Sequence, residues 1–420
     1  MLKIIFYVLL LIALVDNVQA QESGYELLGS YKTEGYVFAV SVSSNGSFIA
    51  ASSPGKIYSF DREGKPLWNI YPKDGLKEMK VCSNGEYIAL RSEGEVYLFN
   101  KNGNQLNFFS PGHDVHNLAI SPDCSYVVAA SITQIAEGGR YIFISKQAGP
   151  LRIGFNIPGS INTLSISSNG SYIAAGYSTD RIVYSTGLEE DEIGIFNRSE
   201  DFFYPFRSFQ TDSEVRIVSI SSDGSFLSAV SGNNIYFYDI NLGKMSKKDM
   251  LGINAISVSS NGSYVAALSG DNIHLFNRSG TLLWSYNTNY STTDVMVSSD
   301  SSRIIAASGR DIYIFDNGGT LLWSYRTDKD VLSVSLSPDG SYAAAGSKDL
   351  KVYFIGEKAS QSITPAIQTT LATPEVPIIT TSTQTPETFQ NYTTPNKSTP
   401  FPSVLSAIVM LLVFWCWQRR

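Results

Sequence analysis

The chain has 420 residues, 43% of them hydrophobic and 16% charged, so it can bury a large core, and division by length suggests two or three domains. Its formal net charge of -7 provides no basic footprint, which argues against nucleic acid as a partner and disfavours generic attraction to anionic lipid. Three cysteines in a chain of this length do not make a disulfide framework.

Residues 1–20 are predicted to be a signal peptide. Lys3 precedes an apolar run from Ile4 to Val15, and Val18-Gln19-Ala20 places small residues where a signal peptidase reads the chain. The alternative is a retained anchor, but the apolar run is shorter than the roughly 20 residues needed to span a bilayer. We therefore expect an exported protein, cleaved after Ala20.

One pattern then recurs eight times, usually as an aliphatic residue followed by Ser-Ser-Asn-Gly-Ser or Ser-Pro-Asp-Gly-Ser. Successive copies start 39, 39, 46, 54, 38, 39 and 39 residues apart. A period near 40 is typical of the blades of a β-propeller. The eight copies begin at Val42, Val81, Ile120, Ile166, Ile220, Val258, Val297 and Leu336.

The sixth repeat shows the expected strands most clearly, at 255–259, 264–268, 273–276 and 282–286. Asn261-Gly262 is predicted to supply the positive backbone angles of a tight hairpin between the first two strands. Four short antiparallel strands per repeat predict an all-β fold. We expect a single eight-bladed propeller over residues 21–357, and two separate smaller propellers are the alternative.

The first strand of each repeat alternates large and small residues. This suits tapered blades that approach closely near an axis. Ser41, Ser165, Ser257 and Ser335 exemplify the small positions. The large ones, two residues before each motif, are Val40, Met79, Leu118, Leu164, Val218, Ile256, Val295 and Val334.

The eighth repeat lacks a fourth strand, because it stops after a third strand at 352–355. Repeats six and seven end in Leu-Trp-Ser-Tyr-x-Thr, at 283–288 and 322–327, and the start of the mature chain carries Leu-Gly-Ser-Tyr-Lys-Thr at 28–33. We therefore expect the N-terminal strand to complete the last blade, which removes open sheet edges.

These repeats resemble the WD-type and quinoprotein-type propeller repeats of surface proteins from methanogenic archaea. The motifs Ser-Pro-Asp-Gly-Ser-Tyr and Leu-Leu-Trp-Ser-Tyr carry the resemblance, which covers most of the chain. The Gly-His and Trp-Asp pairs of eukaryotic WD repeats are absent. The resemblance implies a propeller displayed at a cell surface.

Residues 358–402 are predicted to be an extended stalk. They are rich in Thr and Ser, and seven prolines prevent any long helix or strand. Fully extended in a polyproline-like form, such a chain reaches at most ~130 Å. Its hydroxyls and the sequons at Asn391 and Asn396 indicate glycosylation.

Residues 403–420 are predicted to be a membrane anchor or a removable sorting signal. The segment from Val404 to Trp417 is almost wholly apolar, and two arginines follow it. This tail is similar to that of archaeal surface proteins that a sortase-like enzyme processes and attaches to lipid. It reads Pro400-Phe401-Pro402 where the best-known form of that signal has Pro-Gly-Phe.

Candidate binding residues lie on loops of the two long repeats. Connections between blades and turns between second and third strands emerge on one face of a propeller, and insertions at 133–140 and 178–193 lengthen that face in blades three and four. Together with the interblade loop 113–116, these insertions predict a ligand-binding patch, because binding residues are often carried by loops that project from a rigid scaffold. The patch comprises His113, Asp114, His116, Glu137, Arg140, Asp180, Arg181, Glu189, Glu190, Asp191 and Glu192.

We expect no metal or cofactor and no catalytic residues. The acidic run 189–192 matches no chelating loop and is interpreted as a solvated charge run, although Ca²⁺ is the alternative. His113 and His116 are interpreted as solvent-exposed or lining the channel mouth rather than as metal ligands, and His274 as a packed residue. The rival class is a quinone-dependent dehydrogenase, whose adjacent cysteine pair this chain lacks.

The cysteines and sequons give the last expectations. Cys82 and Cys124 fall in neighbouring blades, so a bridge is conceivable, but we favour two small buried or turn residues; Cys416 belongs to the tail. Among eight sequons, Asn277, Asn289 and the stalk pair are the favoured glycosylation sites. The sequence therefore predicts a membrane-anchored, non-enzymatic surface propeller that binds an envelope protein, a surface glycan or a copy of itself.

Overall fold

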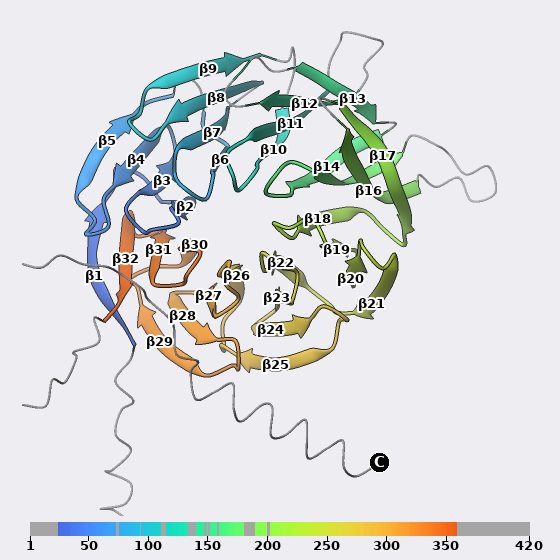
Figure 1. Ribbon diagram of the computed structural model, residues 1–420. Helices are drawn as coiled ribbons and strands as arrows, with labels where there is room; N and C mark the ends of the chain where they lie inside the picture. Colours follow the sequence, from blue (N-terminus) through green and yellow to red (C-terminus); the bar gives the residue numbers. More distant parts are fainter. Residues whose placement is uncertain are drawn as a thin grey trace, which may run out of the picture. The chain divides into compact units, whose positions relative to one another are not determined.

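The computed structural model describes residues 24–358, apart from 73–74, 93, 111–114, 133–139, 147–148, 150–151, 158, 180–189 and 200–201. The described part is all-β: its strands form eight four-stranded antiparallel sheets arranged as the blades of one propeller (Figure 1). No helix in these ranges is both long and apolar enough to cross a membrane. The single eight-bladed propeller predicted from the repeats is confirmed.

Each of the first four blades runs from an inner to an outer strand in chain order. Blade one contains β2 (Ala39–Val42), β3 (Ile49–Ser53), β4 (Lys56–Phe60) and β5 (Pro66–Ile70). Blade two contains β6 (Glu78–Val81), β7 (Tyr87–Ser92), β8 (Glu95–Asn100) and β9 (Gln105–Phe109). Blade three contains β10 (Val115–Ile120), β11 (Tyr126–Ile132), β12 (Arg140–Lys146) and β13 (Arg152–Ile157). Blade four contains β14 (Gly159–Ile166), β15 (Tyr172–Thr179), β16 (Glu190–Ser199) and β17 (Phe202–Thr211).

The remaining blades follow the same order until the last, which also takes the first strand of the chain. Blade five contains β18 (Val215–Ile220), β19 (Phe226–Ser231), β20 (Asn234–Asp239) and β21 (Lys244–Asp249). Blade six contains β22 (Ile253–Val258), β23 (Tyr264–Ser269), β24 (Asn272–Asn277) and β25 (Leu282–Asn287). Blade seven contains β26 (Thr292–Val297), β27 (Arg303–Ser308), β28 (Asp311–Asp316) and β29 (Leu321–Arg326), and blade eight contains β30 (Val331–Leu336), β31 (Tyr342–Ser347), β32 (Lys351–Glu357) and β1 (Tyr25–Lys32).

The repeated motif forms the turn between the first and second strands of a blade. In blade six, Ser259 Oγ donates to Asn261 Oδ1 (3.0 Å) and accepts from the backbone N–H of Tyr264 (3.1 Å). Gly262 has a φ of 65°, and the glycines at the same position of the other blades have φ between 63° and 75°, but Asn261 does not enter the left-handed region. The expectation of positive angles at both residues is therefore wrong: the Asn acts through its side chain, in an Asx turn.

The N-terminal strand closes the ring as predicted. β1 pairs antiparallel with β32, with Tyr31 opposite Val352. The ring of Tyr31 packs on Phe60 of the next blade with centroids 4.9 Å apart, as Tyr286 packs on Phe315 at 4.9 Å. The segment that leads the chain therefore makes the same contact with the next blade as an ordinary fourth strand.

Side chains also link the inner strands of neighbouring blades. Ser335 Oγ accepts from the backbone N–H of Val42 (3.1 Å), and Ser257 Oγ accepts from that of Val297 (3.0 Å). The small residues predicted only to relieve crowding thus also satisfy backbone donors that no strand pairs. The same arrangement joins Thr163 to Val218, Ser165 to Ile220, Ser333 to Val40 and Asp294 to Val334.

A disulfide joins Cys82 of blade two to Cys124 of blade three, with Cα atoms 5.2 Å apart. The preference for two unbridged cysteines is therefore wrong. Within the repeat, Cys82 occupies the Ser position and Cys124 the Gly position. At the preceding interface a Cβ built on Gly85 would lie 3.0 Å from the Cβ of Ser43, so the two positions adjoin across neighbouring blades. The cysteines fill a contact site that the repeat already contains.

Candidate functional site

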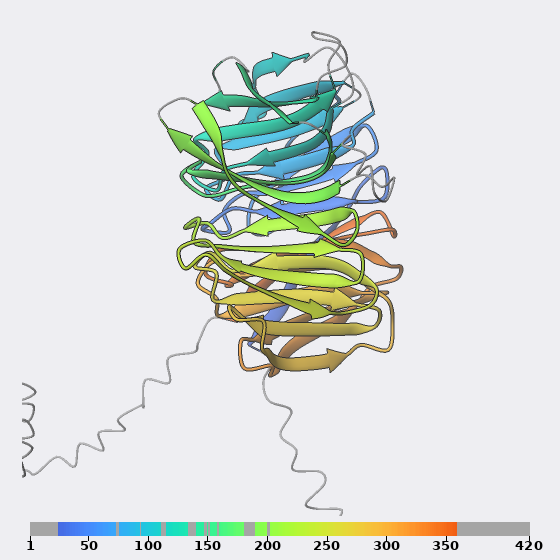
Figure 2. The same cartoon turned by 90° about the vertical axis from the view of Figure 1, so that its right-hand side faces the viewer.

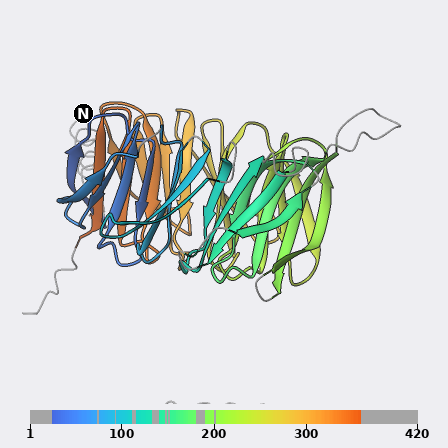
Figure 3. The same cartoon turned by 90° about the horizontal axis from the view of Figure 1, so that it is seen from above.

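One face of the propeller holds the strand ends at which one blade is joined to the next. We call this the connection face; it carries the connections between blades, such as 33–38, and the turns from second to third strands, such as 53–56. β16 and β17 have 10 residues each, whereas third and fourth strands elsewhere have five to eight. Figure 2 and Figure 3 show the ring from its edge, with strands crossing the thickness of the disc. The extra length lies at both ends of these strands, since Thr179 pairs with Glu190 on the connection face and Ser199 pairs with Phe202 on the opposite face.

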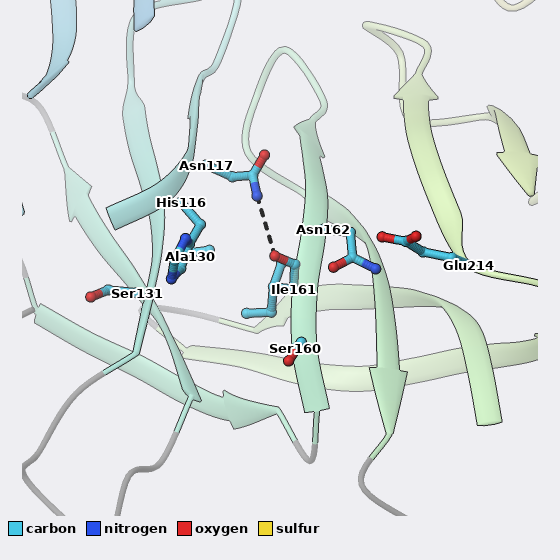
Figure 4. Close-up of a pocket in the computed structure, with 8 residues that line it drawn as sticks. All are labelled: His116, Asn117, Ala130, Ser131, Ser160, Ile161, Asn162 and Glu214. Atoms are coloured by element: carbon cyan, nitrogen blue, oxygen red, sulfur yellow. Dashed lines mark hydrogen bonds between the residues drawn. The ribbon is translucent and has the colours of Figure 1, made fainter. Parts of the chain in front are cut away.

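A pocket of about 380 Å³ opens beside the start of β14 on the connection face. Blade three contributes the ends of β10 and β11, blade four the start of β14, and blade five the residue preceding β18 (Figure 4). We call it the interblade pocket. Its lining is polar with two apolar members, and consists of His116, Asn117, Ala130, Ser131, Ser160, Ile161, Asn162 and Glu214.

Hydrogen bonds hold two carboxamides at the pocket wall. Asn117 Nδ2 donates to the backbone carbonyl of Ile161 (3.3 Å), which links blades three and four. Asn162 Nδ2 donates to Ser178 Oγ (3.5 Å), and that hydroxyl donates to Asp191 Oδ1 (2.5 Å). A chain of contacts therefore runs from the acidic strand β16 through β15 to the pocket lining.

The neighbouring pair on blade four is also hydrogen bonded. Tyr177 OH donates to Glu192 Oε2 (2.8 Å). Burial raises the pKa of the Tyr177 phenol well above its ordinary value, and the Glu192 carboxylate that accepts its proton raises it further. The phenol therefore stays protonated at physiological pH and serves as a fixed donor to Glu192.

The structure places the predicted patch residues unevenly. His116 is exposed and lines the interblade pocket, but it lies in β10 rather than in a loop. Asp191 and Glu192 belong to β16, so the ends of the predicted insertion 178–193 are strand and not loop. Arg140 and Glu190 begin β12 and β16, and nothing further is described of their side chains. His113, Asp114, Glu137, Asp180, Arg181 and Glu189 lie outside the described residues.

Sequence reasoning missed most of the pocket lining, including Asn117, Asn162 and Glu214. A signal was present in the aligned repeats. Four residues before the motif, blades three and four carry His116 and Asn162, where blade one has Phe38, but blade six also has a polar residue there, Asn254. The contribution of blade five had no such signal, because it depends on how two blades are placed side by side.

Other predicted residues lie away from the pocket. His274 is half-buried on β24 near the ring of Phe276, with Nδ1 unpaired, and burial lowers the pKa of its imidazole, with Lys248 adding to the shift. Asn289 is exposed, whereas the Asn277 amide oxygen accepts from the backbone N–H groups of Ser279 and Thr281. Asn391 and Asn396 lie outside the described residues. In the described ranges no group of three or more His, Cys, Asp or Glu side chains is placed to hold a metal ion.

Two family models match parts of the chain. A WD domain, G-beta repeat, matches residues 152–184, which run from the last strand of blade three into blade four. A family of unknown function, DUF5711, matches residues 263–378. No curated protein matches the chain. Together with the eight-bladed ring, the first match identifies a WD-like propeller repeat protein, a class consistent with binding or scaffolding.

Proposed function

We propose that this protein is a binding propeller displayed at the cell surface, which recognises another protein of the envelope through the connection face of blades three to five. The observation that carries the proposal is the interblade pocket, which blades three, four and five line together. Concave sites with a few convergent polar groups on a rigid scaffold are where proteins bind ligands.

Display outside the cytoplasm is supported by the Cys82–Cys124 disulfide. Structural disulfides persist in oxidising compartments and are rare in the cytosol. The predicted signal peptide and the Thr- and Pro-rich segment at 358–402 agree with export and with a stalk. The apolar tail at 403–420 supplies the proposed membrane attachment.

We propose recognition rather than catalysis because of how the pocket groups are arranged. Its imidazole and its carboxylate, His116 and Glu214, come from different blades, and no hydrogen bond joins them among the described residues. General acid–base chemistry needs such groups within reach of a shared reacting atom. A dye-reduction assay with pyrroloquinoline quinone and Ca²⁺ tests the rival dehydrogenase function directly, and we expect no activity.

The experiment measures binding of the purified full chain to envelopes from cells that lack its gene. We expect Asn162→Ala to weaken binding about tenfold, which corresponds to ~1.4 kcal/mol. The matched control is Asn254→Ala, at the same repeat position in blade six, where the amide donates to the carbonyl of Thr292 (3.3 Å). Equal binding by both variants and the parent would contradict the assignment to this pocket.

A further inference from the structure

We infer that the interblade pocket receives the cationic end of a lysine or arginine side chain from the partner protein. This inference rests on the function proposed above and names the group that the pocket recognises. It draws on three features of the described residues: an unpaired carboxylate, two amide oxygens left without donors, and an apolar floor.

The unpaired carboxylate is that of Glu214. It is exposed, and within the described part of the chain no ion pair or hydrogen bond engages it. On the connection face the exposed Asp249 and Asp271 likewise lack an ion pair among the described residues, whereas five other acids there are each paired with a cation. These pairs are Glu34–Lys56 (2.6 Å), Asp212–Lys247, Asp311–Arg326 (3.6 Å), Asp328–Lys351 (2.7 Å) and Asp330–Lys348 (2.9 Å). Glu214 is therefore an acid without a counter-charge in the described fold, and it is the one that lines the interblade pocket.

The orientation of both pocket amides is fixed by what they contact. Asn117 faces the carbonyl of Ile161, which can only accept, so the Asn117 amide nitrogen must point there. Ser178 has one proton, and it is given to the carboxylate of Asp191, so Ser178 can only accept from Asn162. Each amide thus uses its nitrogen in the fold, and its oxygen remains for a ligand.

Asp191 is therefore a positioning residue in this site. It acts through Ser178 on the amide of Asn162 and does not itself line the pocket. The acidic run 189–192, interpreted from the sequence as a solvated charge run, thus contains a residue that sets which end of the Asn162 amide faces the pocket. Two amide oxygens and one carboxylate therefore offer acceptors in the pocket, beside the His116 imidazole, the Ser160 hydroxyl and the second N–H of each amide.

A lysine or arginine side chain matches this lining. Its ammonium or guanidinium group carries three or five N–H donors and no acceptor, and its methylene stem packs well on apolar surface. Ile161 and Ala130 are the apolar members of the pocket lining. A basic group also replaces the counter-charge that Glu214 lacks.

The test uses the full chain with ¹³C at histidine Cε1. The chain has three histidines, and His→Gln substitutions assign their resonances. His116 reports on the pocket, and His274 on β24 reports on the rest of the ring. The probes are blocked tetrapeptides that differ only in one central residue: Arg, Lys, citrulline or norleucine. Agmatine and a chitin oligosaccharide serve as a free guanidinium and a neutral sugar.

We expect the Arg and Lys peptides to shift the His116 resonance and leave that of His274 in place, and the citrulline and norleucine peptides to shift neither. Glu214→Gln should weaken the Arg peptide about tenfold. The control Asp330→Asn, which changes an acid already paired with Lys348, should alter affinity less than twofold.

Each other outcome contradicts a defined part of the inference. Equal binding of Arg and citrulline peptides, or an unchanged affinity for Glu214→Gln, overturns the cationic assignment. Agmatine binding without peptide binding overturns the protein source. A His116 shift with the oligosaccharide alone overturns the cationic group but leaves the proposed binding site intact, whereas envelope binding that survives Asn162→Ala overturns both.

Discussion

Removing the disulfide while keeping its contact site is the sharpest test of how the blades are joined. Cys82→Ser with Cys124→Gly returns to both positions the residues that the repeat uses elsewhere, such as Ser43 and Gly85. The variant should therefore fold with the same packing between blades two and three. Any loss of stability then measures the cross-link itself.

The magnitude follows from chain entropy and local backbone conformation. The bridge spans a sequence separation of 42 residues, for which loop closure in the unfolded chain corresponds to ~4 kcal/mol. Cys124 has a φ of 65°, a left-handed conformation that costs a non-glycine residue ~1 kcal/mol and costs Gly almost nothing. We therefore expect the free energy of unfolding to fall by about 3 kcal/mol, which for a domain of this size corresponds to roughly 4 °C in Tm.

Guanidinium unfolding followed by intrinsic fluorescence measures this difference. Cys82→Ser with Cys124→Ser is the matched control, because Ser301 already occupies the Gly position in blade seven with a φ of 65°. It should be about 1 kcal/mol less stable than the Gly variant. A Ser/Gly variant as stable as the oxidised parent would refute the reasoning.

Other contacts give three further expectations. Tyr31→Ala and Tyr286→Ala should each lower the free energy of unfolding by about 3 kcal/mol, since both rings pack on the next blade in the same way. Urea titrations measure both differences. A loss near zero for Tyr31→Ala alone would mean that the N-terminal strand does not stabilise the closed ring. The Arg278 guanidinium holds the pKa of Asp239 below its usual value, so the stability from this pair is present above the unfolded pKa of about 3.9 and is lost as pH falls through the lower folded pKa. Asp239→Asn should accordingly be less stable than the parent at pH 7 and match it near pH 2, which pH-dependent unfolding checks; a constant gap at every pH contradicts this. Asn289, which is exposed in a sequon, should carry a glycan on the native protein, detectable as a mass increase on its tryptic peptide that Asn289→Gln abolishes, and an unmodified native peptide contradicts it.

The sequence predicted the strands because each blade is built from local contacts. The strands expected in repeat six, from 255 to 286, are β22 to β25 with ends shifted by two residues or fewer. Even the pairing of β1 with β32, between the two ends of the propeller, was predictable, because Leu28 to Thr33 repeats the fourth-strand motif that blade eight lacks. Because the repeats share one motif, this long-range pairing could be predicted by comparing short segments of the chain.

Side-chain contacts between blades were harder to predict, because they depend on how one sheet packs against the next. The Cys82–Cys124 bridge illustrates this: from the sequence we favoured two unbridged cysteines, and only the packing showed that the Ser and Gly positions of adjacent repeats adjoin. The path from Asp191 through Ser178 to Asn162 likewise joins three strands that the motif does not relate.

By itself, then, the amino-acid sequence determined the number of blades, the strand order within each and the segment that closes the ring, since hydrophobic alternation and turn chemistry act over a few residues. Only the tertiary structure decided which side chains meet across blades three, four and five, and it brought Glu214 to the same pocket as His116. The physical reason is that side-chain packing between sheets sets their relative placement, and a pocket forms where that packing leaves polar groups without partners.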